Sequence, residues 1–388
     1  MLNICVKNLF LLIFKRLCSI LNDRIIHYFE VTDMKTTKRI VSLILVSCIL
    51  MLSFIMSASA VSNRKEALPL SAGLEALRDQ FNYDVGAEGD GYALDYCYYS
   101  PVGMNDTGKY PVVIYLHGIG HGTYVGSQLD DSTMPTWASA ELQAKWEDAD
   151  GAYIILPRCP EDKDQFWSKS FIEPLRALID SFIEKHGKNV DTSRIFIGGS
   201  SAGGEMTWDL AIAYPEYFAG IYPLAATGTR TTADIQKTKD VAIWVFASKL
   251  DPLISYSASV LPQWEKICEY NAKPHNCRLS AFGEVLNPDG TKGDSNHRLY
   301  TTIMYDFFTV NGEVYPNVTT ANGNGYPVQF KNSKGIISWM SDKHSEFGSD
   351  DVATENTSSL NIVEAFIIPI RNFFMKMLNI IQRFLGLI

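Results

Sequence analysis

One short stretch of the sequence has the residue types and the spacing of a nucleophilic serine. Gly199-Ser200-Ser201-Ala202-Gly203 fits G-x-S-x-G, a pattern that lifts the central serine hydroxyl clear of the backbone on a sharp strand-to-helix turn. Because the residues two before and two after this serine pass close together, Gly199 and Gly203 leave the room that the turn needs. We predict that Ser201 is a nucleophile. The alternative interpretation is a tight turn with two solvated serines.

An acidic residue that could hold a general base lies at the end of a later apolar run. The run 241–246 is expected to be a strand, and it leads into Ser248-Lys249-Leu250-Asp251-Pro252. With this type of nucleophile the acid follows the serine in the chain and lies at the carboxyl end of a strand. We predict that Asp251 fixes the tautomer of the base and stabilises its protonated form. An Asx turn before the proline is the alternative.

The general base should be a histidine that follows the acid. His297 comes just after a polar loop, 287–296, that follows the last predicted strand. His275 precedes that strand, at its wrong end, and His344 ends the last helical stretch. We predict that His297 takes the proton from Ser201. The alternative is a loop histidine exposed to water.

Two backbone N–H groups are expected to hold the oxyanion that forms when the serine attacks a carbonyl. One belongs to Ala202, which follows the nucleophile at the start of a helix and also gains from the positive end of the helix dipole. The other should come from the glycine-rich loop after the strand that ends at Leu116. We expect Ile119 to supply it, with Gly120 as the close alternative.

The histidines and cysteines do not have the spacing of a metal site. His117 and His121 are four residues apart, but they flank glycines in a loop rather than lie on a helix, so we expect a structural role for His117 and no metal. Cys268 and Cys277 are close enough in sequence for a disulfide, and free buried thiols are the alternative. The other cysteines of the body are Cys97 and Cys159. No cofactor is expected.

Apolar runs and helical spacings alternate along the body of the chain. We expect strands over 92–99, 111–116, 152–156, 195–197, 220–225, 241–246 and 277–282, and helices over 70–81, 171–186, 206–213, 261–270 and 335–340. Continuous apolar strands separated by helices predict an α/β fold, with a mostly parallel sheet covered by helices on both faces. Such a sheet would bring the loops that carry Ser201, Asp251 and His297 to one edge.

Composition limits the classes of partner. The length of 388 residues suggests one large domain or two small ones, and 46% hydrophobic residues can form a substantial core. The formal net charge is −9, and since both chain ends are net basic, the body between them is more acidic than the whole. An acidic body lacks the basic footprint of a protein that binds nucleic acid or polyanionic substrates.

The N-terminal region has the pattern of a secretory signal. Lys35, Lys38 and Arg39 precede the apolar run 40–56, and small residues end in Ala58-Ser59-Ala60. We expect cleavage near Ala60 and exclude 1–60 from the fold; residues before Met34 are then an upstream extension or follow a mistaken start. A membrane anchor is the alternative, although the run is slightly short to span a bilayer.

The C-terminal region is expected to be separate from the fold. Residues 345–361 are polar and acidic, as in a linker. Residues 362–388 place apolar side chains at helical spacing with Arg371, Lys376 and Arg383 toward the other side, which predicts a basic amphipathic helix that Pro369 kinks or splits. Such a helix fits an anionic membrane surface, and docking on its own domain or a second copy is the alternative.

Several longer motifs occur together between Tyr110 and Trp339. They are Tyr110-Pro-Val-Val-Ile-Tyr-Leu-His-Gly, Leu156-Pro-Arg-Cys-Pro, Asp191-Thr-Ser-Arg-Ile, Gly199-Ser-Ser-Ala-Gly-Gly, Thr207-Trp-Asp-Leu-Ala and Tyr214-Pro-Glu-Tyr-Phe-Ala-Gly. In this combination the chain resembles the α/β-hydrolase esterases of the predicted-peptidase, feruloyl-esterase and polyhydroxybutyrate-depolymerase group. The resemblance implies an α/β-hydrolase catalytic domain over 61–344 with the triad Ser201, Asp251 and His297. Asn296 departs from it, since family members usually have glycine before the histidine, and 307–334 is longer than expected.

Two classes of function follow from these residues. The first is a secreted serine hydrolase that cleaves carboxylic esters, such as acyl or feruloyl esters, on a small molecule or a plant polysaccharide; a serine peptidase of the same fold would use the same machinery. The second is a non-catalytic surface-binding module, which would not need the glycine-flanked serine turn. Trp167, Trp208 and Trp244 are candidates for sugar or aromatic contacts, with core packing the expected role of the last two.

Overall fold

The computed structural model describes residues 66–129, 134–146, 149–160, 166–226, 230–287, 289–300, 309–310, 313–314, 318–324 and 335–345. By its contacts the chain divides into two units, Met1–Glu66 and Ala67–Ile388, and all of the described helices and strands belong to the second. The predicted signal segment within 1–60, the helical tail 362–388 and, apart from Ser345, the linker 345–361 lie outside the described residues.

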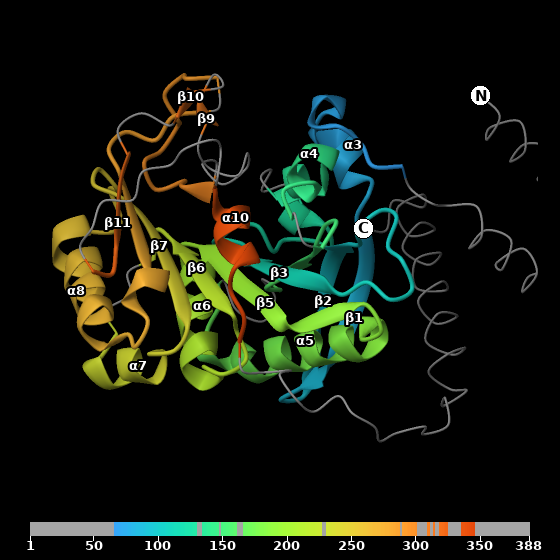
Figure 1. Ribbon diagram of the computed structural model, residues 1–388, viewed down its shortest axis with the longest axis horizontal. Coiled ribbons are helices and arrows are strands. Elements are labelled where there is room, and N and C mark those ends of the chain that lie inside the picture. The colour runs from blue at the N-terminus through green and yellow to red at the C-terminus, as the bar shows by residue number, and fades with distance from the viewer. Residues whose placement is uncertain are drawn as a thin grey trace, which may run out of the picture. The chain divides into compact units, whose positions relative to one another are not determined.

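A nine-stranded sheet forms the centre of the second unit, in the order β1-β2-β4-β3-β5-β6-β7-β8-β11 (Figure 1). Its strands are β1 (Asn82–Gly89), β2 (Tyr92–Tyr99), β3 (Tyr110–Leu116), β4 (Tyr153–Pro157), β5 (Val190–Ser200), β6 (Gly220–Leu224), β7 (Ala242–Ser248), β8 (Arg278–Phe282) and β11 (Val318–Asn322); β9 (Thr309–Val310) and β10 (Glu313–Val314) pair separately. The neighbours from β4 to β8 pair in parallel. Antiparallel pairs join β1 to β2, β2 to β4 and β8 to β11.

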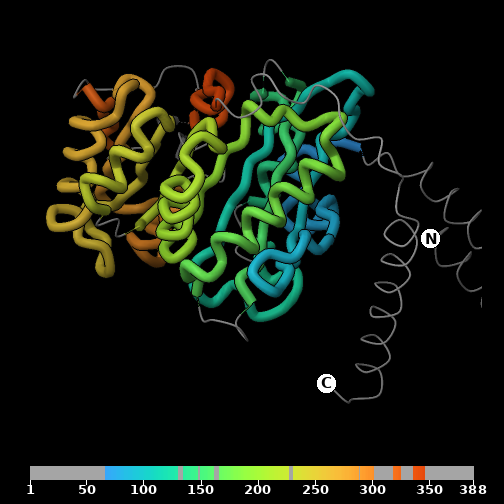
Figure 2. Tube along the Cα trace, turned by 90° about the horizontal axis from the view of Figure 1, so that it is seen from below, coloured from blue at the N-terminus to red at the C-terminus, as the bar shows by residue number. Residues whose placement is uncertain are grey.

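Helices cover both faces of this sheet (Figures 1 and 2). The α-helices are α3 (Leu74–Arg78), α4 (Ala140–Gln143), α5 (Ile172–His186), α6 (Ala202–Ala213), α7 (Thr232–Lys237), α8 (Leu261–Tyr270) and α10 (Ile336–Ser341). The short helical turns are η1 (Leu70–Ala72), η2 (Ser127–Leu129), η3 (Met134–Ala138), η4 (Lys169–Phe171), η5 (Tyr256–Val260) and η6 (Pro274–Asn276). Helices α5 to α8 lie along one face, and α4 and α10 lie on the other.

The alternation of side chains along the central strands divides the core into two layers. On β3, Val113 and Tyr115 belong to the layer that contains α10, whereas Val112 and Ile114 belong to the layer under α5 and α6. Because both faces are covered, all seven residues of β3 are buried, as expected of a central parallel strand. Each fully buried aliphatic side chain of this kind contributes roughly 1.5–3 kcal/mol to stability.

The parallel sheet with helices on both faces confirms the predicted α/β-hydrolase fold. The bounds of β2 and α8 agree with the sequence pattern, and the other expected core elements shift by a residue or a few at their ends. The expected helix over 70–81 is wrong in its length: Gly73, at φ 88°, separates η1 from α3. The pattern missed β1, β11 and α7, of which the two strands lie at the sheet edges and are only partly buried.

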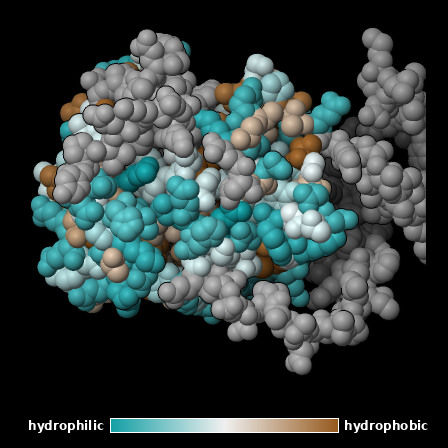
Figure 3. Space-filling model, viewed as in Figure 1, coloured by the Kyte–Doolittle hydropathy of each residue, from teal (hydrophilic) through white to brown (hydrophobic). Residues whose placement is uncertain are grey.

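The face of the molecule in Figure 3 is mostly hydrophilic over the described residues, with small hydrophobic patches between polar areas. Scattered apolar side chains on such a surface are normal for a folded domain. Within the ranges that the structure describes, there is no helix of the length and apolar character needed to cross a membrane.

Candidate active site

Ser201 is the single residue between a strand and a helix, and its backbone conformation is rare for a serine. β5 ends at Ser200 and α6 begins at Ala202, and Ser201 between them has φ 55° and ψ −118°. Its N–H donates to the carbonyl of Leu224 at 2.9 Å, and its own carbonyl accepts from the N–H of Glu205 at 3.0 Å. Neighbouring elements therefore hold the strained turn in place, as expected where strain serves to present a side chain.

The glycines around Ser201 are required by close approach of backbone segments. A Cβ placed on Gly203 would lie 2.0 Å from the carbonyl oxygen of Leu116 at the end of β3. A Cβ on Gly199 would lie 2.6 Å from both the carbonyl carbon of Gly203 and the oxygen of Leu116. Side chains at either position would force β3, β5 and α6 apart, so the elbow depends on both glycines.

The structure brings the three residues predicted from the sequence into one hydrogen-bonded chain. Nδ1 of His297 lies 2.8 Å from Oδ2 of Asp251, and Nε2 of His297 lies 3.0 Å from Oγ of Ser201. A carboxylate can only accept, so Nδ1 carries the proton that it donates to Asp251. Nε2 is then unprotonated and faces the serine hydroxyl, which is the tautomer that a general base needs.

The carboxylate of Asp251 has separate partners for its two oxygens. Oδ1 accepts the N–H groups of Leu253 and Ile254 at 2.8 and 3.0 Å, and Oδ2 accepts from His297. The side chain is only 1% exposed. The Asx turn that was the alternative interpretation of Asp251 is therefore present as well, and it holds the carboxylate rigid toward the histidine.

The loop that carries His297 is held by two polar side chains that precede it. Oγ of Ser295 accepts the N–H of His297 at 3.1 Å, and Oδ1 of Asn296 accepts the N–H of Val285 at 2.8 Å. Asn296 therefore ties the histidine loop back to the segment that leaves β8. The sequence showed Asn296 only as a departure from the family pattern, because its partner is a backbone group that no motif reveals.

The histidines set aside from the sequence do not join this cluster. Nδ1 of His344 lies 3.1 Å from Oγ of Ser193, near the amino end of β5, and His275 lies in η6 before β8. The ring centroids of His117 and His121 are 6.4 Å apart. Among the described residues there is no group of three or more His, Cys, Asp or Glu side chains that could hold a metal ion.

Ala202 and the loop that carries Ile119 both lie next to Ser201. Ala202 is the first residue of α6, where N–H groups have no partner within the helix. Gly118 approaches from the loop after β3: a Cβ placed on it would lie 3.8 Å from Cβ of Ser201. Among the described residues, the backbone–backbone hydrogen bonds of turns, loops and helix caps include none that the N–H of Ala202 or of Ile119 donates. Both N–H groups therefore stay the predicted donors to an oxyanion.

The cysteines and tryptophans of the described residues have well-defined surroundings. Cys97, Cys159, Cys268 and Cys277 are free, so of the two alternatives for Cys268 and Cys277 the free thiols are found. The proposed sugar contact of Trp167 is wrong: its side chain is only 4% exposed, since it packs against Phe171 and donates from Nε1 to the carbonyl of His117 at 3.0 Å. Trp208 and Trp244 are buried in the core, as expected.

The chain is similar to known esterases and to a peptidase. No family model matches the chain. Feruloyl esterase B from Neurospora crassa is 28% identical over 121 residues, which cover 28% of this chain and 37% of that protein. A thermostable esterase of known structure is 26% identical, with a TM-score of 0.49, over 58% of this chain and 60% of its own. An acylaminoacyl peptidase is 16% identical, with a TM-score of 0.42, over 61% of this chain and 42% of its own.

These matches cover only parts of the relatives, and the first curated relative is spanned over 37% of its length. The two TM-scores lie below 0.5, so the fold assignment depends on the strand order and pairing described above. The α/β-hydrolase fold that the sequence motifs indicated is confirmed by the strand order and pairing, and the similarity to a feruloyl esterase agrees with the esterase resemblance of those motifs.

Proposed function

We propose that the protein hydrolyses carboxylic esters, with Ser201 as the nucleophile, His297 as the general base and acid, and Asp251 as the residue that orients His297. The single observation that supports this proposal is the hydrogen-bonded chain from Asp251 through His297 to Ser201. A surface-binding module would have no use for a strained serine aligned with an unprotonated imidazole nitrogen, so the geometry favours an enzyme.

The reaction would proceed through an acyl-enzyme. Oγ of Ser201 attacks the ester carbonyl while Nε2 of His297 takes the hydroxyl proton, and the carbonyl oxygen becomes an oxyanion held by the N–H groups of Ala202 and Ile119. The tetrahedral intermediate collapses, and His297 gives its proton to the alcohol that leaves. Water then attacks the acyl-enzyme, with His297 again taking a proton, and the acid is released with Ser201 regenerated.

The loops around the site carry most of the exposed large hydrophobic side chains of the described residues. They are Ile119, Tyr124 and Val125 after β3, Phe166 after β4, and Leu250 and Leu253 after β7. Because these three strands are parallel, the loops leave the same edge of the sheet as Ser201. Exposed apolar groups around a polar catalytic centre suit an ester with an apolar or aromatic acyl group. A feruloyl ester, as the name of the curated relative suggests, is the substrate we propose.

A fluorophosphonate probe and a panel of esters test this function. We expect the wild type to be labelled, Ser201→Ala to remain unlabelled, and methyl ferulate or a nitrophenyl ester to be cleaved faster than the matching amide. No labelling of the wild type, or equal labelling of both proteins, would contradict the enzyme. Preferential cleavage of the amide would instead support a serine peptidase.

We also propose that the enzyme is secreted and that its tail contacts a surface. The support is the pattern of charged, apolar and small residues in 35–60 and the basic amphipathic spacing in 362–388. Expression of the full chain in an exporting host should give a mature protein that begins near Val61, as N-terminal sequencing would show. Removal of 362–388 should reduce binding to anionic vesicles, and unchanged binding would contradict the role of the tail.

A further inference from the structure

The loop 117–122, between β3 and the segment that leads to η2, is fixed by residues that the reaction itself does not use. His117 begins this loop and is only 3% exposed, although its neighbour Ile119 is 60% exposed. His117 is thus a buried imidazole two residues before the candidate oxyanion donor, and each of its ring nitrogens needs a hydrogen-bond partner.

The two ring nitrogens of His117 have partners that determine the tautomer. Nε2 accepts the backbone N–H of Cys159 at 3.0 Å, so it carries no proton. Nδ1 lies 2.7 Å from the carbonyl oxygen of Gly118 and must therefore donate its proton to it. Burial keeps the ring neutral, because it lowers the pKa of His117 to about 4.

The hydrogen bond to Gly118 fixes the orientation of the next peptide unit. The carbonyl of Gly118 and the N–H of Ile119 belong to one trans peptide plane, in which the two groups point in opposite directions. Since the carbonyl is drawn inward to the buried imidazole, the N–H of Ile119 faces outward. The backbone at Gly118 is next to Ser201, since a Cβ placed on Gly118 would lie 3.8 Å from Cβ of Ser201.

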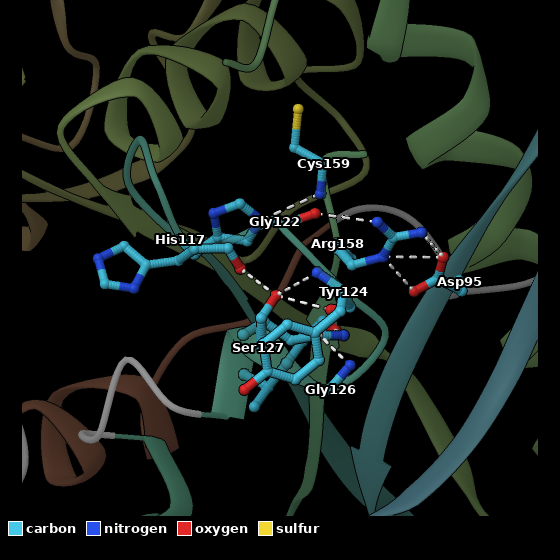
Figure 4. Close-up of polar contacts among 11 residues, drawn as sticks. Asp95, His117, Gly122, Tyr124, Gly126, Ser127, Arg158 and Cys159 are labelled. Atoms are coloured by element: carbon cyan, nitrogen blue, oxygen red, sulfur yellow. Dashed lines mark hydrogen bonds and ion pairs between the residues drawn. The ribbon is translucent and has the colours of Figure 1, made fainter. Parts of the chain in front are cut away.

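The surroundings of His117 make this arrangement rigid. Trp167 donates from Nε1 to the carbonyl of His117 at 3.0 Å. At the far end of the loop, Nη1 of Arg158 donates to the carbonyl of Gly122 at 2.9 Å (Figure 4). Nε and Nη2 of the same guanidinium bind the carboxylate of Asp95 on β2, at 2.8 and 2.5 Å. The loop is thus tied to the exit of β4 at both of its ends.

The contact of the loop with the segment that follows β4 leaves no room for a further side chain. A Cβ placed on Gly122 would lie 1.8 Å from the carbonyl oxygen of Cys159. The backbone of Cys159 thus meets His117 through its N–H and Gly122 through its carbonyl (Figure 4). Donors held in this way need no reorganisation when charge develops, which is the condition under which an oxyanion hole is effective.

We propose that His117 is a positioning residue for the oxyanion hole: by donating from Nδ1 to the carbonyl of Gly118, it turns the N–H of Ile119 toward the oxygen of a carbonyl bound at Ser201. This inference rests on the proposed ester hydrolysis. It gives His117 a specific task beyond the general structural role expected from the sequence. The hydrogen bond from Cys159 serves this task because it leaves the proton of the ring on Nδ1.

Two amide substitutions separate the contacts of the ring. In His117→Asn the new side-chain amide can occupy the place of Nδ1 and still donate to Gly118, but it cannot reach Cys159. In His117→Gln the amide oxygen can occupy the place of Nε2 and accept from Cys159, while the donor to Gly118 is lost. The second variant therefore removes only the contact that orients Ile119.

We expect kcat for a nitrophenyl ester to fall roughly tenfold to hundredfold in His117→Gln, less than the full loss of an oxyanion donor. In His117→Asn it should stay within about threefold of the wild type, and KM should change by less than about twofold in both variants. The affinity of an aryl boronic acid, which forms a tetrahedral anion on the serine, should fall in parallel with kcat. A purely structural role would lower kcat only in proportion to the folded fraction of each variant, measured by thermal unfolding.

Equal kcat in the two variants, or a loss explained by unfolding, would overturn the inference while the proposed function stands. Should a variant not fold, NMR of the wild type gives the answer: the boronic acid should shift the amide proton of Ile119, and the imidazole of His117 should be protonated on Nδ1 alone. An unmoved Ile119 amide or a proton on Nε2 would overturn it. A wild type that no fluorophosphonate labels would instead refute the proposed function and, with it, this inference.

Discussion

Nε2 of His297 lies 3.0 Å from Oγ of Ser201, although the two residues are 96 positions apart in the chain. Ser201 follows β5 and His297 follows β8, and β6 and β7 lie between these strands in the sheet. The contact exists because parallel strands deliver the loops that follow them to the same edge. The distance between His297 and Ser201 therefore depends on the packing of the strands between them, and not only on the two side chains.

Removal of the serine hydroxyl should abolish nearly all activity. We expect Ser201→Ala to lower kcat by about 10⁶, with only the residual catalysis of the oxyanion donors left. Ser200→Ala is the matched control, because Ser200 is the adjacent serine at the end of β5 and is only 3% exposed. The control should keep kcat within a few-fold, as measured with a nitrophenyl ester. If Ser200→Ala lost activity while Ser201→Ala kept it, Ser201 would not be the nucleophile.

Removal of the charge that orients the base should leave the fold intact and still slow the reaction. Asp251→Asn keeps the shape of the side chain but can favour the other tautomer of His297, so kcat should fall by about 10⁴. The control is Asp294→Asn, since Asp294 is exposed and forms its ion pair with Arg298. Circular dichroism should show both variants folded. Equal kcat in the two variants would remove Asp251 from the mechanism.

A methyl group at the elbow should destabilise the protein according to the space around each glycine. In Gly203→Ala the new Cβ would lie 2.0 Å from the carbonyl of Leu116, and we expect a loss of about 3 kcal/mol or more in the free energy of unfolding. In Gly118→Ala the nearest atom would be 3.5 Å away, so the loss should be below about 1 kcal/mol. Urea unfolding of both variants measures the difference. Similar stability of the two would mean that the elbow tolerates a side chain.

Acidification should destabilise the protein through two histidines whose pKa the fold lowers. Burial lowers the pKa of His117 from 6.5 to about 4, so the unfolded chain binds more protons than the folded one between these values. Stability is therefore full above pH 6.5 and falls as the pH drops toward 4, by up to roughly 3 kcal/mol for this one group. Burial and the neighbouring Lys185 lower the pKa of His186 to about 4 as well, which adds to the effect.

Urea unfolding at pH 7 and pH 4.5 measures this dependence. His117→Asn removes the titrating ring, so its free energy of unfolding should change less between the two pH values than that of the wild type. His186 remains in the variant and accounts for part of the residual slope. A wild type equally stable at both pH values would show that His117 is protonated without cost in the folded protein.

The sequence by itself indicated the fold class and the candidate residues of the site. The apolar runs of β3 to β8 are continuous because their strands are buried on both faces, and this makes them visible without any structure. The glycines that flank Ser201 report a local constraint of the turn, and the order of serine, acid and histidine selected Asp251 and His297. Edge strands such as β1 and β11 escaped detection because their side chains are only partly buried and their patterns are correspondingly weak.

Only the tertiary structure decided which groups meet. Trp167 is a candidate for sugar or aromatic contacts in the sequence, but packing against Phe171 and His117 encloses it. Asn296 and Arg158 hold loops through backbone carbonyls and N–H groups, which almost every residue possesses and which no sequence pattern can distinguish. Side-chain types determine what chemistry a chain can perform. The choice of partners for backbone groups depends on distances between remote segments, and these exist only after folding.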